Sequence, residues 1–114
     1  MNNAIDVLFQ KSDPDVKEAY RQLIAELEKF GKVIEESKKT SIHLKNKTGF
    51  AGIHPRKNYF ILNIVSSSPI QSPRVIKQEQ VSKSRFHNEV KIEKQDDIDS
   101  KLMKWLKNAY ELVK

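Results

Sequence analysis

The stretch TSIHLKNKTGFAGIHPRKNYFILNIV, residues 40–65, decides the fold. In its first part, apolar Ile42 and Leu44 alternate with polar His43 and Lys45, the period-two pattern of a strand with one buried face. Two turn-rich segments, NKTG and HPRKN, then divide the stretch into three strands. The last strand, YFILNIV, is the most apolar and is expected to be central. Short connections of this kind predict an antiparallel meander.

A helix is predicted before this meander, over residues 13–31. Asp13 can cap its first N–H groups, and Pro14 suits the first helical position. Apolar side chains then recur every three or four residues, which gives the helix one buried stripe. Gly31 ends the helix, because glycine readily adopts positive φ. Residues 1–12 are predicted to form a turn or a short helix that packs against this stripe.

A second helix is predicted at the other end of the chain, over residues 96–113. Acidic residues gather in its first turn, where the helix dipole favours negative charge. An apolar stripe follows at helical spacing and includes Trp105, which is expected to anchor the core.

Together these patterns predict an α+β fold in a single domain, 1–114. An antiparallel meander sheet of five or six short strands is flanked by an N-terminal and a C-terminal helix packed on one face. The sheet occupies 32–94, with a Ser- and Pro-rich loop at 66–73 and two short strands expected at 74–76 and 88–92. The predicted core contains Leu27, Ile42, Leu44, Leu62, Trp105 and Leu106.

Positive charge is concentrated in the sheet region. Residues 32–94 hold 13 basic and 5 acidic side chains, a net of +8, whereas the whole chain of 114 residues carries +6. Such a region attracts anions, although lysines on exposed strands also serve solubility alone. The anion-binding candidates lie at strand starts and turns, and Tyr59 beside them is a candidate for stacking on a base. These candidates are Lys39, Lys45, His54, Arg56, Lys57, Arg85 and His87.

Catalytic and cofactor signatures are missing from the sequence. It contains no cysteine, no glycine-rich phosphate loop, no nucleophile elbow and no zinc-binding helix motif. The histidines, His43, His54 and His87, are scattered without chelating spacing, so no metal site is assigned. We therefore expect no catalytic residue and no cofactor.

Three spaced blocks carry a resemblance to a known family. They are KKTSIHLKNKTGFAGIHPRKNYF at 38–60, FHNEVKI at 86–92 and DIDSKLMKWLKNAYEL at 97–112. Together they resemble the uncharacterised bacterial domain of unknown function numbered 5655, over nearly the whole chain. The resemblance supports the fold and implies no established activity, catalytic residue or cofactor.

The sequence thus favours a non-catalytic binding or accessory module over an enzyme. The expected partner is a polyanion such as nucleic acid, a phosphate ligand or an acidic protein, bound through the basic sheet region. A protein-interaction or homodimer module is the alternative, and a metal-dependent hydrolase with a cryptic site is less favoured. No membrane-spanning or signal segment is visible, so a cytoplasmic protein is expected, either a monomer or a weak homodimer.

Overall fold

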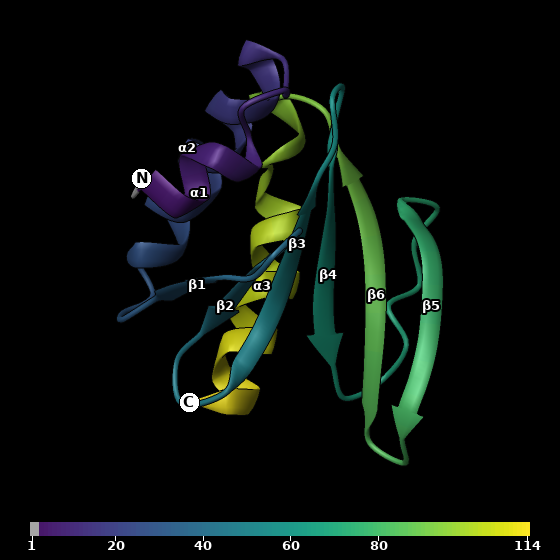
Figure 1. The fold of residues 1–114 in the computed structure, drawn as a ribbon. Coiled ribbons are helices and arrows are strands. Elements are labelled where there is room, and N and C mark those ends of the chain that lie inside the picture. Colours follow the sequence, from purple (N-terminus) through teal and green to yellow (C-terminus); the bar gives the residue numbers. More distant parts are fainter. Residues whose placement is uncertain (1–2) are drawn as a thin grey trace.

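The computed structural model describes residues 3–114, and its helices pack on one face of an antiparallel sheet (Figure 1). The helices are α1 (Asn3–Leu8), α2 (Pro14–Glu28) and α3 (Ser100–Val113), with a 3-10 turn η1 (Gln95–Asp97). The strands are β1 (Ile34–Ser37), β2 (Ile42–Lys45), β3 (Gly49–Pro55), β4 (Phe60–Ser66), β5 (Val75–Ser82) and β6 (Arg85–Ile92). The predicted α+β fold with flanking helices is confirmed. No helix among these residues is long and apolar enough to cross a membrane.

The sheet has six strands in the order β1-β2-β3-β4-β6-β5, all antiparallel. The first four strands form a meander, whereas the sequence predicted that the meander would extend to five or six strands. The last hairpin is then placed so that β6 pairs with β4 and β5 becomes the edge strand. The sequence indicated only a short strand at 74–76 in this region. The longer β5 was missed because an exposed edge strand needs no apolar alternation, and most of β5 is exposed.

Both long helices differ in extent from the prediction. α2 ends at Glu28 with Lys29 as its cap, and Gly31 lies beyond it with φ 142°, so the expected positive φ is present. α3 does not begin at residue 96, because the acidic run first forms η1. The Asp99 side chain then accepts a hydrogen bond from the Leu102 N–H at 2.9 Å and caps α3.

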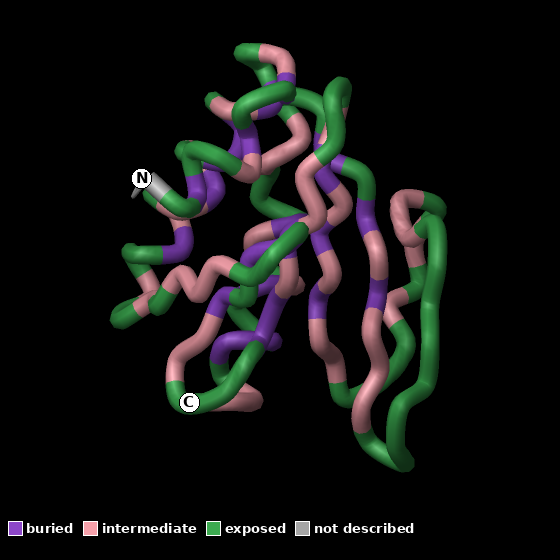
Figure 2. The backbone as a smooth tube through the Cα atoms, in the orientation of Figure 1, coloured by how far each residue is buried: buried purple, intermediate pink, exposed green. Residues whose placement is uncertain are grey.

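The hydrophobic core lies between the sheet and the helices (Figure 2). The predicted core residues Leu27, Ile42, Leu44, Leu62 and Leu106 are fully buried there. The expectation for Trp105 was wrong, since this side chain is only partly buried and packs at the edge of the core. Trp105 lies where the loop after β4, with Ile70 and Gln71, faces α3.

An aromatic cluster joins the N-terminal segment to the sheet. The rings of Phe9, Tyr20 and Phe60 pack together, and all three are fully buried. Residues 1–2 of the predicted N-terminal turn or helix lie outside the described residues, and α1 forms the helical part. The Tyr20 hydroxyl donates a hydrogen bond to Glu35 Oε1 at 2.7 Å, which links α2 to β1.

This tyrosine gives the fold a dependence on alkaline pH. Burial, and then the hydrogen bond to Glu35 and its negative charge, raise the pKa of Tyr20 well above its ordinary value of 10.0. The stabilisation is fully present below pH 10, the unfolded value, and is lost as pH rises above it. Relative to Tyr20→Phe, the wild-type free energy of unfolding should therefore fall by about 1.4 kcal/mol per pH unit above about pH 10. Urea unfolding of both proteins between about pH 8 and 11.5 measures this difference. Tyr59→Phe is the control, and parallel profiles for Tyr20→Phe and wild type would contradict the assignment.

Candidate functional site

The face of the sheet opposite the helices is open to solvent, and cross-strand pairing sets which side chains lie on it. His43 pairs with Gly52, Gly52 with Asn63, and Asn63 with Glu89, so these residues form one row across four strands. Residues in direct register point to the same face of a sheet. The core residues alternate with this row, which therefore belongs to the open face.

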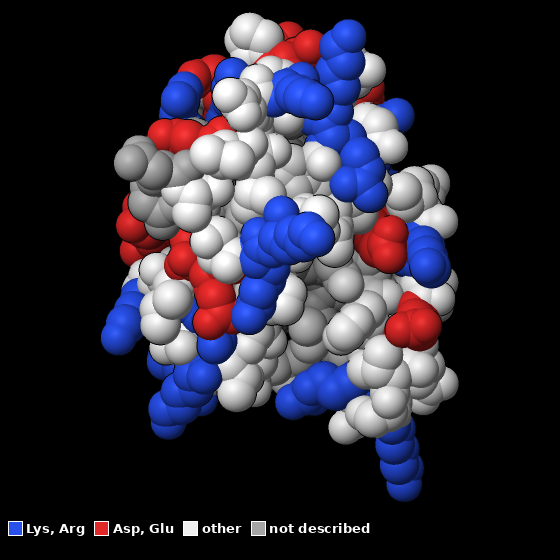
Figure 3. Space-filling model, in the orientation of Figure 1, with Lys and Arg blue, Asp and Glu red and all other residues white. Residues whose placement is uncertain are grey.

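The open face is hollowed around Gly52, where the row has no side chain. The hollow has a volume of about 180 Å³, and we call it the histidine hollow. It is lined by His43, Gly49, Ala51, Gly52, His54, Asn63, Val65 and His87. In Figure 3 the surface is recessed near the middle of the sheet, with an uncharged floor and charged side chains around it. A Cβ on Gly52 would meet Asn63 Cβ at an ordinary 3.8 Å, so glycine leaves space there without being sterically required.

Asn63 supplies the floor of the histidine hollow with an unused amide. Its Oδ1 is shielded from solvent and has no hydrogen-bond partner among the described residues. A buried polar group without a partner costs about 1–3 kcal/mol. Asn63 lies in the middle of the most apolar strand, on the outward side. Rotation of the side chain toward the hollow would let Oδ1 accept a hydrogen bond from a bound molecule, which would remove this cost.

The histidine hollow brings together three imidazoles from three strands, β2, β3 and β6. Between residues 3 and 114, no group of three or more His, Cys, Asp or Glu side chains is arranged to hold a metal ion. The imidazoles offer ring faces and hydrogen-bonding nitrogens to a ligand.

A second part of the site is the turn between β3 and β4, which carries Arg56 and Lys57; we call it the basic turn. Contacts to the start of α2 hold its backbone. Ser12 Oγ donates to the Arg56 carbonyl at 2.6 Å, and the Asp13 N–H donates to the Lys57 carbonyl at 2.8 Å. Asn58 Nδ2 also donates to Asp13 Oδ2 at 2.8 Å. The two cations are thus presented on a fixed backbone.

Tyr59 borders the basic turn and is partly buried. The Lys91 ammonium lies 4.7 Å from the centroid of its ring, a cation–π distance. Lys91 pairs with Ile61 on the open face, in the same row as His54. A ring and a cation therefore lie between the basic turn and the histidine hollow.

The remaining anion-binding candidates do not form one cluster. Lys39 lies in the exposed β1–β2 turn. The Lys45 ammonium lies 3.5 Å from Glu36 Oε2, so the carboxylate neutralises part of its positive charge. Arg85 is the first residue of β6, and its guanidinium donates a hydrogen bond to the carbonyl of the preceding residue, Ser84, at 3.0 Å. Lys91 lies six positions after Arg85 along the extended strand, a span of about 20 Å. Arg85 thus lies at the opposite end of the sheet from the basic turn.

The sequence-based reasoning missed part of this arrangement. Gly52, Asn63 and Lys91 were not identified as site residues, and His43 was placed on the outward face of its strand but was not included among the anion-binding candidates. Both His43 and Asn63 occupy outward-facing positions of the period-two strand pattern, and this pattern could have identified them as candidate site residues of the open face. The signal is clearer for Asn63, because it is a polar residue within an otherwise apolar strand.

A scan against protein-family models gives a match over residues 5–113, to the family described as Domain of unknown function (DUF5655). The chain belongs to this family. The DUF5655 match includes every residue of the histidine hollow and of the basic turn. Neither the curated proteins nor the solved structures give a match. The DUF5655 description names no activity, so function has to be argued from the geometry of the site.

Proposed function

We propose that the protein is a non-catalytic module that binds single-stranded nucleic acid on the open face of its sheet. The observation that carries this proposal is the unpartnered Asn63 amide among three imidazoles, next to the basic turn. Open sheet faces with exposed rings are a common platform for unpaired bases. A side-chain amide can hydrogen-bond the edge of a base as both donor and acceptor.

The surrounding charges support the proposal of a base, rather than a phosphate, as the group bound in the histidine hollow. Glu36 lies opposite His43, and Glu89 lies opposite Asn63. Glu79 also lies opposite His87. Carboxylates at these positions repel a phosphate, whereas an uncharged base is compatible with them. A planar base would place one edge against the Asn63 amide and its faces near the imidazoles.

The phosphate backbone would then follow the cations outside the histidine hollow. Arg56 and Lys57 stand at one end of the open face, and Lys91 lies between them and the hollow. Tyr59 offers a further ring for a neighbouring base. The net charge of +8 over residues 32–94 supports attraction of a polyanion to the sheet region.

The test is a fluorescence anisotropy titration with labelled single-stranded and double-stranded DNA and RNA at about 50 mM salt and above. We expect single strands to bind more tightly than duplexes, with a dissociation constant on the order of 10⁻⁴–10⁻⁶ M near physiological salt. Replacing Arg56 and Lys57 together by alanine should weaken binding and flatten the log–log salt slope by about 2. Lys101→Ala/Lys104→Ala on α3 removes the same charge from the other side of the molecule and should change binding less.

A second variant isolates the base contact. Gly52→Val fills the histidine hollow and should weaken single-strand binding about tenfold, since one stacked base contributes about 1–3 kcal/mol. Its salt slope should stay that of the wild type, because no phosphate contact is removed. Asn63→Leu should act in the same way. The free energy of unfolding of each variant is measured beside the titration, so that a loss of fold is recognised.

Two results would overturn the proposal. One is the absence of binding at about 100 μM protein in low salt. The other is equal binding of single strands and duplexes that Gly52→Val and Asn63→Leu leave unchanged, because the open face would then contribute only non-specific charge.

A further inference from the structure

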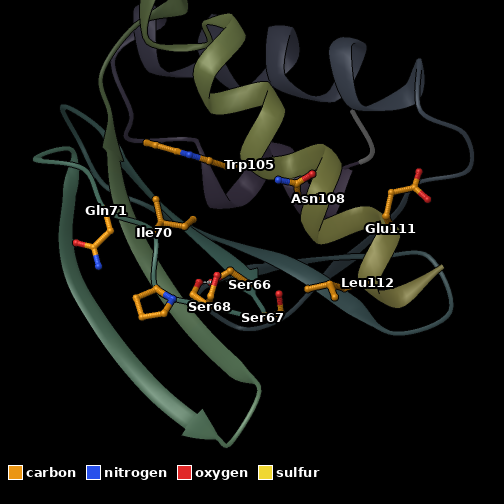
Figure 4. Close-up of a pocket in the computed structure, with 10 residues that line it drawn as sticks. Ser66, Ser67, Ser68, Ile70, Gln71, Trp105, Asn108, Glu111 and Leu112 are labelled. Carbon is orange, nitrogen blue, oxygen red and sulfur yellow. Dashed lines mark hydrogen bonds between the residues drawn. The ribbon is translucent and has the colours of Figure 1, made fainter.

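A larger pocket lies on the opposite side of the sheet from the histidine hollow. It is formed where the loop after β4 faces the last turns of α3, and it has a volume of about 490 Å³, within the usual range for small-molecule sites (Figure 4). We call it the loop–helix pocket. Trp105, Ile70 and Leu112 give it apolar surface, and serine and amide side chains give it polar surface.

The loop that forms one wall is held in place by the buried side chain of Asn88. Asn88 Nδ2 donates to the Ile64 carbonyl at 2.9 Å and to Ser66 Oγ at 2.8 Å. Its Oδ1 accepts from the Ile70 N–H at 3.4 Å and from Gln78 Nε2 at 2.6 Å. Gln78 Nε2 also donates to the Ile70 carbonyl at 3.1 Å. The pocket is therefore preformed, and a ligand need not order the loop.

Four polar side chains in the lining of the loop–helix pocket have no hydrogen-bond partner among the described residues. The indole N–H of Trp105, the amides of Asn108 and Gln71 and the hydroxyl of Ser67 make no hydrogen bond with any described residue. In Figure 4, Trp105, Asn108 and Ile70 lie along the same opening. A ligand that enters here meets one aromatic ring and several uncharged donors and acceptors.

The charges at the loop–helix pocket are one paired carboxylate in the lining and one cation beside it, the Lys101 ammonium 5.8 Å from the centroid of the Trp105 ring. Glu111 is the charged side chain among its described lining residues, and its carboxylate lies 3.1 Å from the Lys107 ammonium and 3.7 Å from that of Lys114. A cationic ligand would compete with both lysines, and an anionic ligand finds no lysine or arginine in the lining. The lining therefore matches an uncharged molecule.

From these observations we infer that the loop–helix pocket binds a neutral, hydroxyl-bearing ring, such as a sugar unit of a saccharide. The C–H face of such a ring packs against the Trp105 indole, and its hydroxyls replace water at Asn108, Gln71 and Ser67. A purely apolar ligand would leave these amides and hydroxyls without partners, which costs free energy. This site is separate from the proposed nucleic-acid surface and does not depend on it.

Trp105 itself provides the readout, because it is the only tryptophan in the chain. The protein is titrated with glucose, galactose, N-acetylglucosamine, maltose and cellobiose, up to about 50 mM each, and tryptophan emission is followed. At least one saccharide should give a saturable change with a midpoint on the order of 1 mM. AMP and inorganic phosphate are the charged comparison probes and should bind more weakly.

Variants separate pocket binding from a general effect on emission. Asn108→Ala should raise the midpoint about fivefold through the loss of hydrogen bonds, and Lys104→Ala, exposed on the same helix, should leave it unchanged. Calorimetry with Trp105→Phe, which keeps a ring but loses the N–H, should also show weaker binding. The inference is overturned if none of the five saccharides binds, if AMP or phosphate binds as tightly, or if Asn108→Ala has no effect. Oligonucleotide binding by Asn108→Ala should match the wild type, so failure of this inference is distinguishable from failure of the nucleic-acid proposal.

Discussion

Phe60→Ala should lower the free energy of unfolding by about 3–5 kcal/mol, the range for deleting a fully buried large aromatic side chain. Phe60 lies at the start of β4, and its ring packs edge-on against Phe9 and Tyr20, with centroids 6.3 and 6.2 Å apart. The variant leaves a cavity where Phe9, α2 and the sheet meet. Urea unfolding followed by circular dichroism measures the loss.

Trp105→Ala is the matched comparison for this prediction. Tryptophan is the larger side chain, but Trp105 is only partly buried, so its removal should cost less than about 2 kcal/mol. Burial therefore predicts a larger loss of stability for Phe60→Ala than for Trp105→Ala, although tryptophan is the larger side chain. A larger loss for Trp105→Ala than for Phe60→Ala would show that the edge of the core is assigned wrongly.

Gly31→Ala should destabilise the protein by about 3 kcal/mol or more, for two additive reasons. With φ at 142°, residue 31 has a backbone conformation that side chains disfavour, at a cost of about 1–3 kcal/mol. A Cβ there would also lie 2.7 Å from the Tyr110 hydroxyl oxygen. That hydroxyl is held by a hydrogen bond to the Lys32 carbonyl at 2.9 Å, so it cannot move without losing the bond.

A double-mutant cycle separates the two causes. Tyr110→Phe alone should cost about 1 kcal/mol, the net value of one hydrogen bond. Combined with Gly31→Ala, it removes the clashing oxygen, so the two losses should sum to more than the double variant shows. Gly49→Ala is the control, because nothing lies within 4 Å of its Cβ position and its φ is not positive. A neutral Gly31→Ala would contradict the strained backbone at this position.

The local patterns of the sequence predicted the fold well where they report on burial. The alternation around Ile42 and Leu44 indicated a half-buried strand, and the structure buries both residues. The same reasoning was wrong at Trp105, because helical spacing shows which way a side chain points but not where the opposite layer ends. The place of β6 between β4 and β5 depends on pairing between distant strands, which no local pattern encodes.

The candidate site was predicted in its residue types more than in its arrangement. His54 and His87 were identified as anion-binding candidates, and the structure places both in the histidine hollow. Arg85 was grouped with Arg56 on charge alone, although β6 carries it to the other end of the sheet. Gly52 was missed because it contributes to the hollow only by lacking a side chain. The resulting space can be recognised only when the register of the neighbouring strands is known.

The insertion of β6 between β4 and β5 also determines how the chain can assemble. β5 and β6 are joined by a tight turn and can form a hairpin from local contacts. The pairing of β6 with β4 joins strands that are further apart in the sequence. Closing the intervening loop costs more conformational entropy than closing the β5–β6 turn, so we expect this pairing to form after the hairpin. Asn88 lies at that closure and joins β4, β6, β5 and the intervening loop through its four hydrogen bonds. The half of the sheet that bears the loop–helix pocket is thus completed only when the hairpin docks.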